Sequence, residues 1–175
     1  MFKRFLIVLA CTLTLSSVSF AESFFVHGQC DVYFSPNGGA TMAIVNLIDS
    51  AQKSVYVLAY SFTSPEIANA LILAKQKGID VKVIVDSSQL TSRGSKVAEV
   101  SAAGVPIWID SKHSIAHNKV IIVDGRYLET GSFNFSHAAE VSNAENALIC
   151  LTLQGAAVYK KNWDFHQSHS VKYGE

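Results

Sequence analysis

The sequence lacks internal repeats, low-complexity tracts and a recognisable linker. These absences exclude a repeat protein and argue against several domains joined by flexible segments. With 175 residues, of which 49% are apolar, the chain has the length of one domain and enough apolar side chains for a hydrophobic core. We therefore expect a single folded domain, which we place at residues 22–175.

The chain also lacks an apolar run long enough for a confident membrane span, but a shorter run lies near its first residue. Lys3 and Arg4 precede the apolar stretch Phe5–Leu15, and Ser19–Ala21 places small residues where a signal peptidase reads. We therefore expect residues 1–21 to be a secretory signal peptide, so that the mature protein is periplasmic or secreted.

Two other fates of this first segment stay open. If it is not cleaved, it would tether the domain to the inner membrane. Alternatively, the residues around Cys11 weakly resemble a lipoprotein cleavage site, so that a lipid-modified Cys11 would be the anchor.

An excess of positive charge is absent as well. Residues 22–175 contain 12 basic and 14 acidic residues, which gives a net charge of −2. Proteins that bind nucleic acid nonspecifically are usually basic overall. If this protein handles nucleic acid, its positive potential must therefore be local.

Cysteine is scarce, since only three are present and only Cys30 and Cys150 would remain after signal cleavage. An even number of cysteines in an oxidising compartment makes a disulfide between these two plausible. The alternative is two unpaired thiols, with Cys150 buried in an apolar strand.

Strand and helix patterns alternate along the chain. Thr63–Glu66 fits a capping box at the start of a helix, and Asp124-Gly125 fits the turn of a hairpin. Strands are predicted at residues 29–34, 54–62, 79–85, 105–109, 120–123, 127–130 and 147–153, and helices at 41–53, 67–77, 97–103 and 156–169. This order predicts an α/β sandwich, in which a mostly parallel, mixed sheet is flanked by helices.

The stretch IAHNKVIIVDGRYLETGSFNFS combines an apolar strand with polar groups on both sides of it. His117 and Lys119 precede the apolar run and point to one face, because side chains alternate along a strand. Ser132 and Asn134 share a face in the same way, and Gly131 before them leaves room for a turn. A cation, a titratable imidazole, a hydroxyl and an amide aimed at one spot suit a phosphate group.

The spacing His-x-Lys, four residues, Asp, six residues, Gly-Ser-x-Asn is similar to the signature of the phospholipase D superfamily. The matching residues are His117, Lys119, Asp124, Gly131, Ser132 and Asn134. The runs AYSFTSPEI, DVKVIVD and NAENALI also resemble the short, single-motif bacterial endonucleases of the Nuc type. The resemblance covers roughly residues 30–165, and it implies the phospholipase D-like fold for the domain.

This resemblance implies a two-step displacement at phosphorus, in which His117 attacks and becomes a phosphohistidine. Lys119, Ser132 and Asn134 would bind the phosphate oxygens. Glu145, within NAENALI, would accept a hydrogen bond from the His117 ring and fix its tautomer.

The resemblance also implies a second copy of the chain, because the family's site uses one histidine to attack and another to protonate the leaving oxygen. Residues 22–110 contain no second His-x-Lys pair. We therefore expect a twofold homodimer whose His117 side chains face each other across the axis.

Asp124 follows the strand rather than sharing the His117 face, so we expect a structural role for it. The resemblance implies neither a cofactor nor a metal, since lysine and protein dipoles carry the charge.

Three further histidines raise the alternative of a zinc site. His113 lies four residues before His117, and His166 and His169 are three residues apart. The sequence around His113 does not predict a helix, so the spacing does not place it on one face with His117. His166 and His169 lie near the chain end, where exposed histidines are common. We therefore expect no metal ligation.

Three functions are compatible with these features. The first is a metal-independent, nonspecific nuclease that acts on DNA and, as a further substrate, RNA. The second is a phospholipase D that cleaves phosphatidylcholine-type lipids, because the same phosphate chemistry serves both. The third is a noncatalytic phosphate-binding domain, against which the complete motif argues. We favour the nuclease, because the sequence shows no extra domain that would build a tunnel for lipid chains.

Overall fold

The computed structural model describes residues 22–26 and 28–175. The predicted signal peptide and Cys11 lie outside the described residues. The strands are β1 Cys30–Phe34, β2 Ser54–Ala59, β3 Asp80–Asp86, β4 Ile107–Asp110, β5 Lys119–Val123, β6 Tyr127–Gly131, β7 Asn146–Leu151 and β8 Val171–Lys172. The α-helices are α1 Ala40–Asp49, α2 Pro65–Gln76, α3 Val97–Ala102, α4 His137–Val141 and α5 Leu153–His169, and Ser87–Leu90 forms a 3₁₀ turn. None of the helices in this part of the chain is long and apolar enough to cross a membrane.

The eight strands form one sheet in the order β1-β7-β6-β5-β2-β3-β4-β8. An α/β arrangement with a mixed sheet flanked by helices is thus confirmed. The expectation of a mostly parallel sheet is wrong, because only β2–β3 and β3–β4 pair in parallel, while the other five pairings are antiparallel. Among the strands, parallel pairing occurs where α2 and α3 connect successive strands, since a parallel connection needs a crossover.

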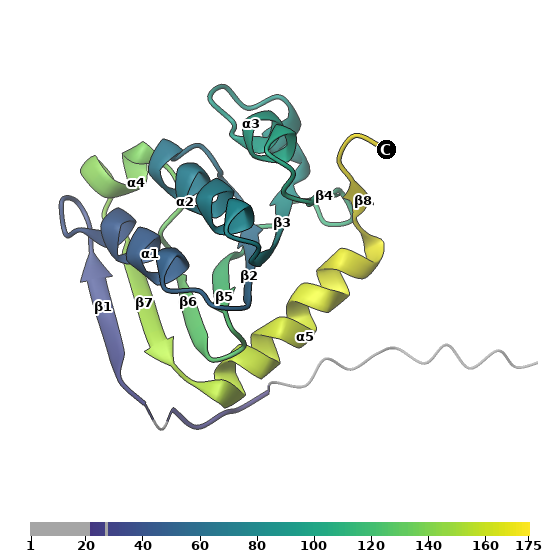
Figure 1. Cartoon of the computed structure of the whole chain (residues 1–175). Helices are drawn as coiled ribbons and strands as arrows, with labels where there is room; N and C mark the ends of the chain where they lie inside the picture. Colours follow the sequence, from purple (N-terminus) through teal and green to yellow (C-terminus); the bar gives the residue numbers. More distant parts are fainter. Residues whose placement is uncertain (1–21, 27) are drawn as a thin grey trace, which may run out of the picture.

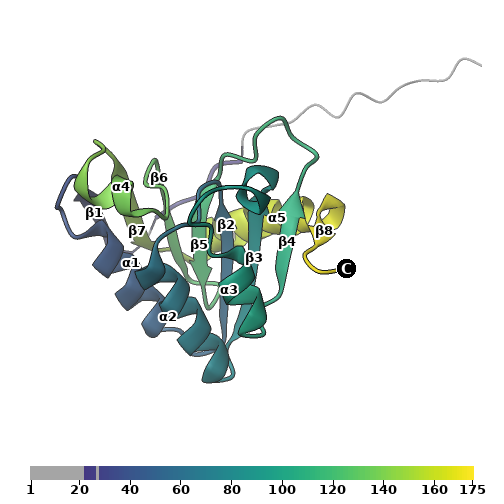
Figure 2. The same cartoon turned by 90° about the horizontal axis from the view of Figure 1, so that it is seen from above.

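Helices cover the two faces of the sheet unequally. The helices α1, α2 and α3 lie on one face, and α5 crosses the other face (Figures 1 and 2). In β5, Ile121 and Val123 pack into the larger core under α1 and α2, whereas Val120 and Ile122 pack into the smaller core under α5. Both faces of β5 are therefore buried, which explains why its sequence is continuously apolar rather than alternating.

The start of α2 differs by one residue from the predicted capping box. Ser64 is the N-cap, and its Oγ accepts a hydrogen bond from the backbone N–H of Ile67 at 3.3 Å. Pro65 occupies the first helical position, where its missing N–H costs no hydrogen bond. Thr63 stays outside the helix, because its N–H donates to the carbonyl of Phe135. The short elements α4 and β8 were not predicted, since neither is long enough to show a periodic pattern.

The disulfide that the sequence left open is formed between β1 and β7. Cys30 and Cys150 are directly opposite each other in the antiparallel register, and their Sγ atoms are 2.04 Å apart. The bond joins residues separated by 120 positions and fastens the edge strand β1 to the sheet. In the chain-entropy model, a cross-link over so long a span restricts the unfolded chain strongly.

We expect reduction of this disulfide to lower the free energy of unfolding by about 2–5 kcal/mol. Urea unfolding with and without dithiothreitol measures the change. The double variant Cys30→Ser/Cys150→Ser is the control, because it should match the reduced protein and show no further response to dithiothreitol. Equal stability of the oxidised and reduced protein would contradict the prediction.

Candidate active site

The motif residues meet at one edge of the sheet because neighbouring strands begin or end there. Lys119 opens β5, Gly131 closes β6, and Asn146 opens β7. In the register, Val120 of β5 is opposite Thr130 of β6, so Lys119 and Gly131 lie at the same level of the sheet. Residues distant in sequence are therefore brought to one edge by antiparallel pairing alone.

Lys119 is the buried charge of this edge, with only 4% of its surface exposed. Its Nζ donates a hydrogen bond to the backbone carbonyl of His117 at 2.8 Å and lies 5.1 Å from the ring centre of Tyr60. Burial lowers the pKa of the Lys119 ammonium group, and the negative charge of Glu145 acts in the opposite direction. A desolvated ammonium group of this kind attracts an anionic ligand more strongly than an exposed one.

The exposed side chain of His117 packs against the same tyrosine. The ring centres of His117 and Tyr60 are 4.4 Å apart, with an angle of 54° between the planes. The residue before it, Ala116, donates its N–H to the buried carboxylate of Asp86 at 2.7 Å. The imidazole is thus oriented by an aromatic ring on one side and by an anchored backbone on the other.

Gly131, Ser132 and Asn134 line the turn after β6. A Cβ on Gly131 would lie 2.2 Å from the backbone oxygen of Asn146, so close approach of β7 requires glycine there. Ser132 is exposed, and its Oγ accepts the backbone N–H of Asn146 at 3.1 Å. The Oδ1 atom of Asn134 is buried and, within the described residues, has no hydrogen-bond partner. Such an orphaned polar atom is costly unless a ligand or water satisfies it.

Glu145 lies near the motif, but its predicted contact is not formed within this chain. Its Oε1 accepts a hydrogen bond from the side chain of Asn143 at 3.1 Å, and its charge acts on Lys119. No hydrogen bond to the His117 ring is present among the described residues. The role of Glu145 in orienting the imidazole stays a prediction.

Asp124 lies at the opposite end of β5 from Lys119. Its carboxylate accepts backbone N–H groups of Gln52, Lys53 and Ser54 at 2.9, 2.7 and 2.9 Å. Burial opposes ionisation, but these hydrogen bonds outweigh it and lower the pKa of the Asp124 carboxyl. The contacts agree with the expected structural role: Asp124 ties the β5–β6 hairpin to the chain entering β2.

Sequence reasoning missed two contributors to the site, Tyr60 and Asp86. Tyr60 follows the last residue of β2 and contacts both His117 and Lys119. Asp86 ends β3 and holds the chain just before His117. Both directly follow or end an apolar strand, and β2 and β3 are parallel, so both side chains reach the same edge of the sheet. Their place at the carboxyl ends of two predicted apolar strands is the feature of the sequence that could have identified Tyr60 and Asp86.

The expectation that His166 and His169 are ordinary exposed histidines is wrong, because His166 is buried and both side chains lie beside His113. His113, His166 and His169 all contact the carboxylate of Asp110, the last residue of β4. His113 reaches Asp110 from a loop, and His166 and His169 reach it from the end of α5. Tertiary packing, rather than helical spacing, brings these side chains together.

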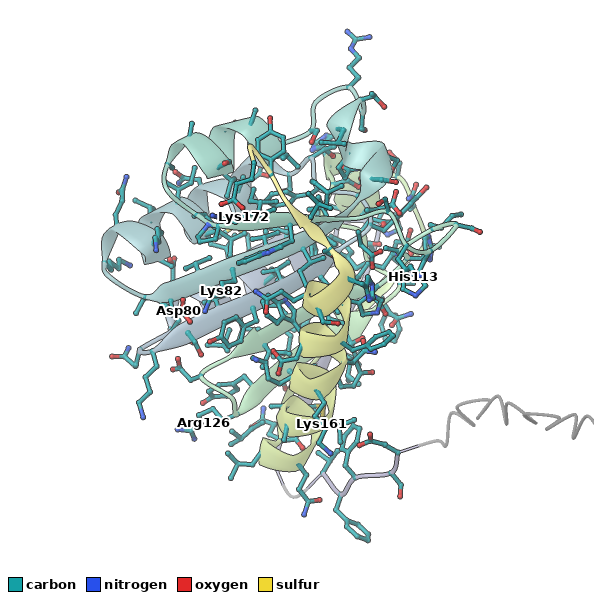
Figure 3. The ribbon with its side chains drawn as sticks, turned by 90° about the vertical axis from the view of Figure 1, so that its right-hand side faces the viewer. Asp80, Lys82, His113, Arg126, Lys161 and Lys172 are labelled. Atoms are coloured by element: carbon teal, nitrogen blue, oxygen red, sulfur yellow. A yellow bond between two sulfur atoms is a disulfide. The ribbon has the colours of Figure 1, made fainter. Side chains whose placement is uncertain are left out.

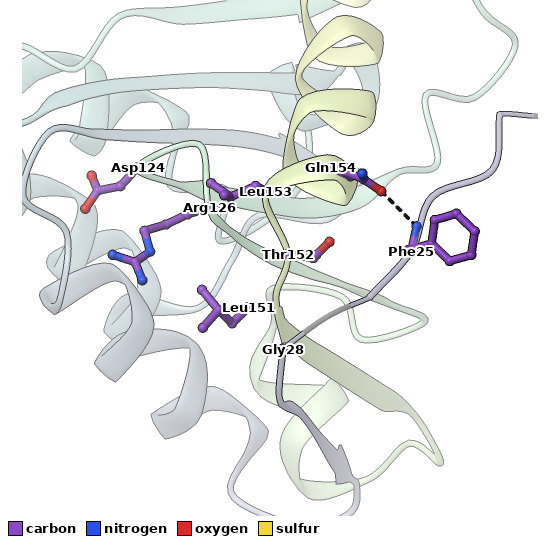
Figure 4. Close-up of a pocket in the computed structure, with 8 residues that line it drawn as sticks. All are labelled: Phe25, Gly28, Asp124, Arg126, Leu151, Thr152, Leu153 and Gln154. Atoms are coloured by element: carbon purple, nitrogen blue, oxygen red, sulfur yellow. Dashed lines mark hydrogen bonds between the residues drawn. The ribbon is translucent and has the colours of Figure 1, made fainter.

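A cleft of about 600 Å³ lies at the other edge of the sheet. It is lined by Phe25, Gly28, Asp124, Arg126, Leu151, Thr152, Leu153 and Gln154 (Figure 4). The side chain of Gln154 accepts the backbone N–H of Phe25 at 3.0 Å across it. Because Asp124 is the only motif residue on its wall, this cleft is separate from the edge that carries His117.

Comparison with known proteins agrees with the motif. A family model described as "Cardiolipin synthase, PLD-like domain" matches residues 44–166. The phospholipase D of Rickettsia felis is 42% identical over 130 residues, which cover 74% of this chain and 65% of that protein. The mitochondrial cardiolipin hydrolase of Xenopus tropicalis is 31% identical over 121 residues, which cover 69% of this chain and 58% of that protein. The chain thus spans less than two thirds of the length of these curated relatives.

Among solved structures, the phospholipase D family member Nuc from Salmonella typhimurium superimposes with a TM-score of 0.80 at 40% sequence identity. The match covers 85% of this chain and 99% of Nuc. NucT from Helicobacter pylori superimposes with a TM-score of 0.76 over 83% of this chain and 99% of NucT. Its identity of 22% shows likeness of fold alone.

A fully buried carboxyl group lies in β6, two residues before Gly131. Glu129 has no exposed surface, and among the described residues neither of its carboxyl oxygens has a hydrogen-bond partner. Burial raises the pKa of Glu129 well above its ordinary value. Because the folded protein holds this proton more tightly than the unfolded chain, the carboxyl group destabilises the fold increasingly as the pH rises above about 4.5.

We therefore expect Glu129→Gln to stabilise the protein, with a gain that grows from about pH 5 to about pH 8. Thermal unfolding across this pH range measures it. The exposed Glu99→Gln is the matched control and should give no gain that grows with pH. A gain for Glu129→Gln that is constant or shrinks with rising pH would refute the raised pKa.

We expect Asp124→Asn to lower the free energy of unfolding by about 1–3 kcal/mol, because the three backbone N–H groups lose a charged acceptor. Asparagine tolerates the left-handed backbone of this residue, whose φ is 54°. Urea unfolding gives the stability, and phosphodiester hydrolysis well below the melting temperature gives the activity. Activity within a few-fold of wild type is expected, whereas a large loss of kcat at unchanged stability would assign Asp124 to the chemistry.

Proposed function

Because the chain belongs to the phospholipase D superfamily, whose members are phosphodiesterases, we propose that it is a metal-independent endonuclease acting on DNA and RNA. The observation that carries this proposal is the match to Nuc, which extends over 99% of Nuc at 40% identity. The proposal is also supported by the arrangement of the catalytic edge, where His117 and Lys119 both contact the ring of Tyr60.

In the first step, a ring nitrogen of His117 attacks phosphorus, and the bond from phosphorus to the leaving oxygen breaks. The partner's His117 donates the proton that the leaving oxygen takes up. The ammonium group of Lys119 neutralises the charge that develops on the nonbridging oxygens, and its burial strengthens this interaction. Asn134 and Ser132 supply polar groups to the same phosphate.

In the second step, water attacks the phosphohistidine. The partner's His117, now neutral, accepts a proton from this water, and the bond between phosphorus and the ring nitrogen breaks. The product carries a terminal phosphate, and both imidazoles return to their starting states. Neither step needs an electron acceptor or a metal ion.

The dimer on which this mechanism depends is supported by apolar side chains near the catalytic edge. Phe34, at the end of β1, is 64% exposed, and Val32 on the same strand is 49% exposed. Ile115, in the loop before His117, is 54% exposed. A twofold interface that brings two His117 side chains together would bury exposed apolar residues of this kind.

A phospholipid substrate is the second candidate, because the relatives from Rickettsia felis and Xenopus tropicalis are named phospholipase D and cardiolipin hydrolase. The phosphodiester chemistry would be the same. Which substrate is cleaved therefore depends on whether a nucleic acid or a lipid fits beside the site. The assay described below distinguishes the two.

We also propose that the protein acts in the periplasm or outside the cell. The disulfide between Cys30 and Cys150 supports an oxidising compartment. Cell fractionation followed by detection with an antibody tests the location. Identification of the first residue of the purified protein tests whether residues 1–21 are cleaved. Recovery of the protein in the cytoplasm would overturn the proposal.

The substrate is tested by offering plasmid DNA, RNA and phosphatidylcholine vesicles side by side, in excess EDTA and well below the melting temperature. We expect cleavage of nucleic acid, lost by at least about 10³-fold in His117→Ala. His137→Ala, an exposed histidine on α4, is the matched control and should keep full activity. Choline release without nucleic-acid cleavage would move the protein to the lipid substrate, and equal activity of His117→Ala would refute the mechanism.

The shared site is tested by subunit mixing. Wild-type protein and His117→Ala are unfolded together in equal amounts and refolded, so that the copies pair at random. If each site needs two copies, about one quarter of the activity of the same total amount of wild type remains; a monomeric site would leave about one half. Sedimentation of the purified protein gives the oligomeric state independently, and a monomer at the working concentration would exclude the shared site.

A further inference from the structure

A second group of titratable side chains lies at the α5 side of the sheet, outside the catalytic motif. Asp110 is the last residue of β4, and His113 follows it in the loop. His166 and His169 belong to the last turns of α5. Figure 3 shows the labelled His113 beside the end of α5 that leads into β8. One ligand-type atom of each of the four residues lies within 4.8 Å of all the others.

We propose that these four side chains form a structural site for one divalent ion of the zinc class. Three imidazoles and one carboxylate make a nitrogen-rich donor set, which suits zinc and its neighbours in the first transition row. Magnesium and calcium prefer oxygen ligands throughout, so they fit poorly. Four protein ligands fill a tetrahedron and leave no open place for a reacting water, which is the arrangement of structural zinc sites.

The spacings around the carboxylate match a small coordination shell. Oδ2 of Asp110 is 2.7 Å from Nδ1 of His166, 3.2 Å from Nδ1 of His113 and 3.3 Å from Nε2 of His169. In a tetrahedral site with bonds of about 2.0–2.1 Å, the ligand atoms are about 3.3 Å apart. The four ligand atoms lie within 4.8 Å of one another, so the side chains need to draw together by at most about 1.5 Å to surround one ion.

The three imidazoles are arranged almost symmetrically. Their ring centres are 5.0 Å apart for His113 and His166, 5.2 Å for His113 and His169, and 5.4 Å for His166 and His169. When imidazoles bind one ion tetrahedrally, each ring centre lies about 3 Å from the ion, and the centres are about 5 Å from each other. The triangle formed by the rings has this size.

The charge and hydrogen bonding of Asp110 also call for a cation. Asp110 is completely buried, and its only side-chain ion-pair partners among the described residues are the three imidazoles, not lysine or arginine. A buried carboxylate is costly without a permanent positive partner. Its Oδ2 has three ring nitrogens around it, although a carboxylate oxygen has only two lone pairs for hydrogen bonds. One central ion would satisfy the oxygen and the three nitrogens together.

The site has a path of entry and a defined neighbour. The side chain of His113 is 39% exposed, whereas those of His166 and His169 are 9% and 17% exposed, so an ion can enter past His113. The second ring nitrogen of His166 is 3.4 Å from the side-chain amide of Asn118. Asn118 lies between His117 and Lys119, so the ion would fasten the loop that carries the catalytic histidine to α5. With Nδ1 of His166 on the ion, its Nε2–H would donate to the amide oxygen of Asn118 once that amide is turned by half a turn, and such an acceptor orients a metal-binding imidazole.

The test uses the purified protein, stripped of metal with a chelator that is then removed, and Zn²⁺ as the probe. We expect binding of about one ion per chain and a rise in melting temperature of several degrees with excess Zn²⁺. In His113→Gln and His169→Gln, the affinity should fall at least about tenfold, and the rise should disappear. His137→Gln, the matched surface control, and His117→Ala should respond as wild type does. The second of these keeps the result independent of the proposed nuclease chemistry.

Because a variant could lose the ion by failing to fold, the absorption spectrum of wild-type protein with Co²⁺ provides a second measurement. Intense visible bands of four-coordinate cobalt are expected, and they are independent of any substitution. Weak bands of six-coordinate cobalt would overturn the proposal. So would an equal response of all variants to Zn²⁺, or no response of the wild type.

Discussion

The groups at the catalytic edge of the sheet are arranged around one constraint, which is that the ammonium group of Lys119 is buried. A charge that is 4% exposed at the mouth of a central strand needs nearby groups to compensate for the water it has lost. The carbonyl of His117, the ring of Tyr60 and the charge of Glu145 all act on it. The hydrogen bond to the carbonyl also holds the backbone of His117, and Tyr60 packs against its ring, so groups that stabilise the lysine also position the histidine.

Sheet topology explains how so many polar groups reach this edge. The parallel strands β2, β3 and β4 all end there, with Tyr60 just after β2, Asp86 at the end of β3 and Asp110 at the end of β4. The antiparallel strands β5 and β7 start there instead, and β6 ends there. Asp110 marks one end of this row and the turn after Gly131 marks the other. The far edge, where Asp124 caps the chain entering β2, has only structural contacts among the motif residues.

Much of the fold and the motif could be predicted from the sequence, because the signals involved are local. The β5–β6 hairpin and α2 follow from an apolar run with a turn and from a cap followed by proline. The predominance of antiparallel pairing could not be predicted, since strand order is decided by packing between distant segments. The same holds for the Tyr60 contact and for the convergence of His113 with His166: neither spacing nor periodicity relates residues 50 or more positions apart. The pairing of Cys30 with Cys150 was open for this reason too, until the register of β1 and β7 placed them opposite each other.

The disulfide has a consequence for the integrity of the molecule as well as for its folding. Within residues 22–26 and 28–175, the helices and strands other than α5 and β8 lie within or at the ends of the span that Cys30 and Cys150 close. That span is in effect a covalent ring, with α5 and β8 attached as a tail. A single protease cut in any of its surface loops would open the ring without releasing a fragment. The two pieces would stay joined covalently by the bond between β1 and β7.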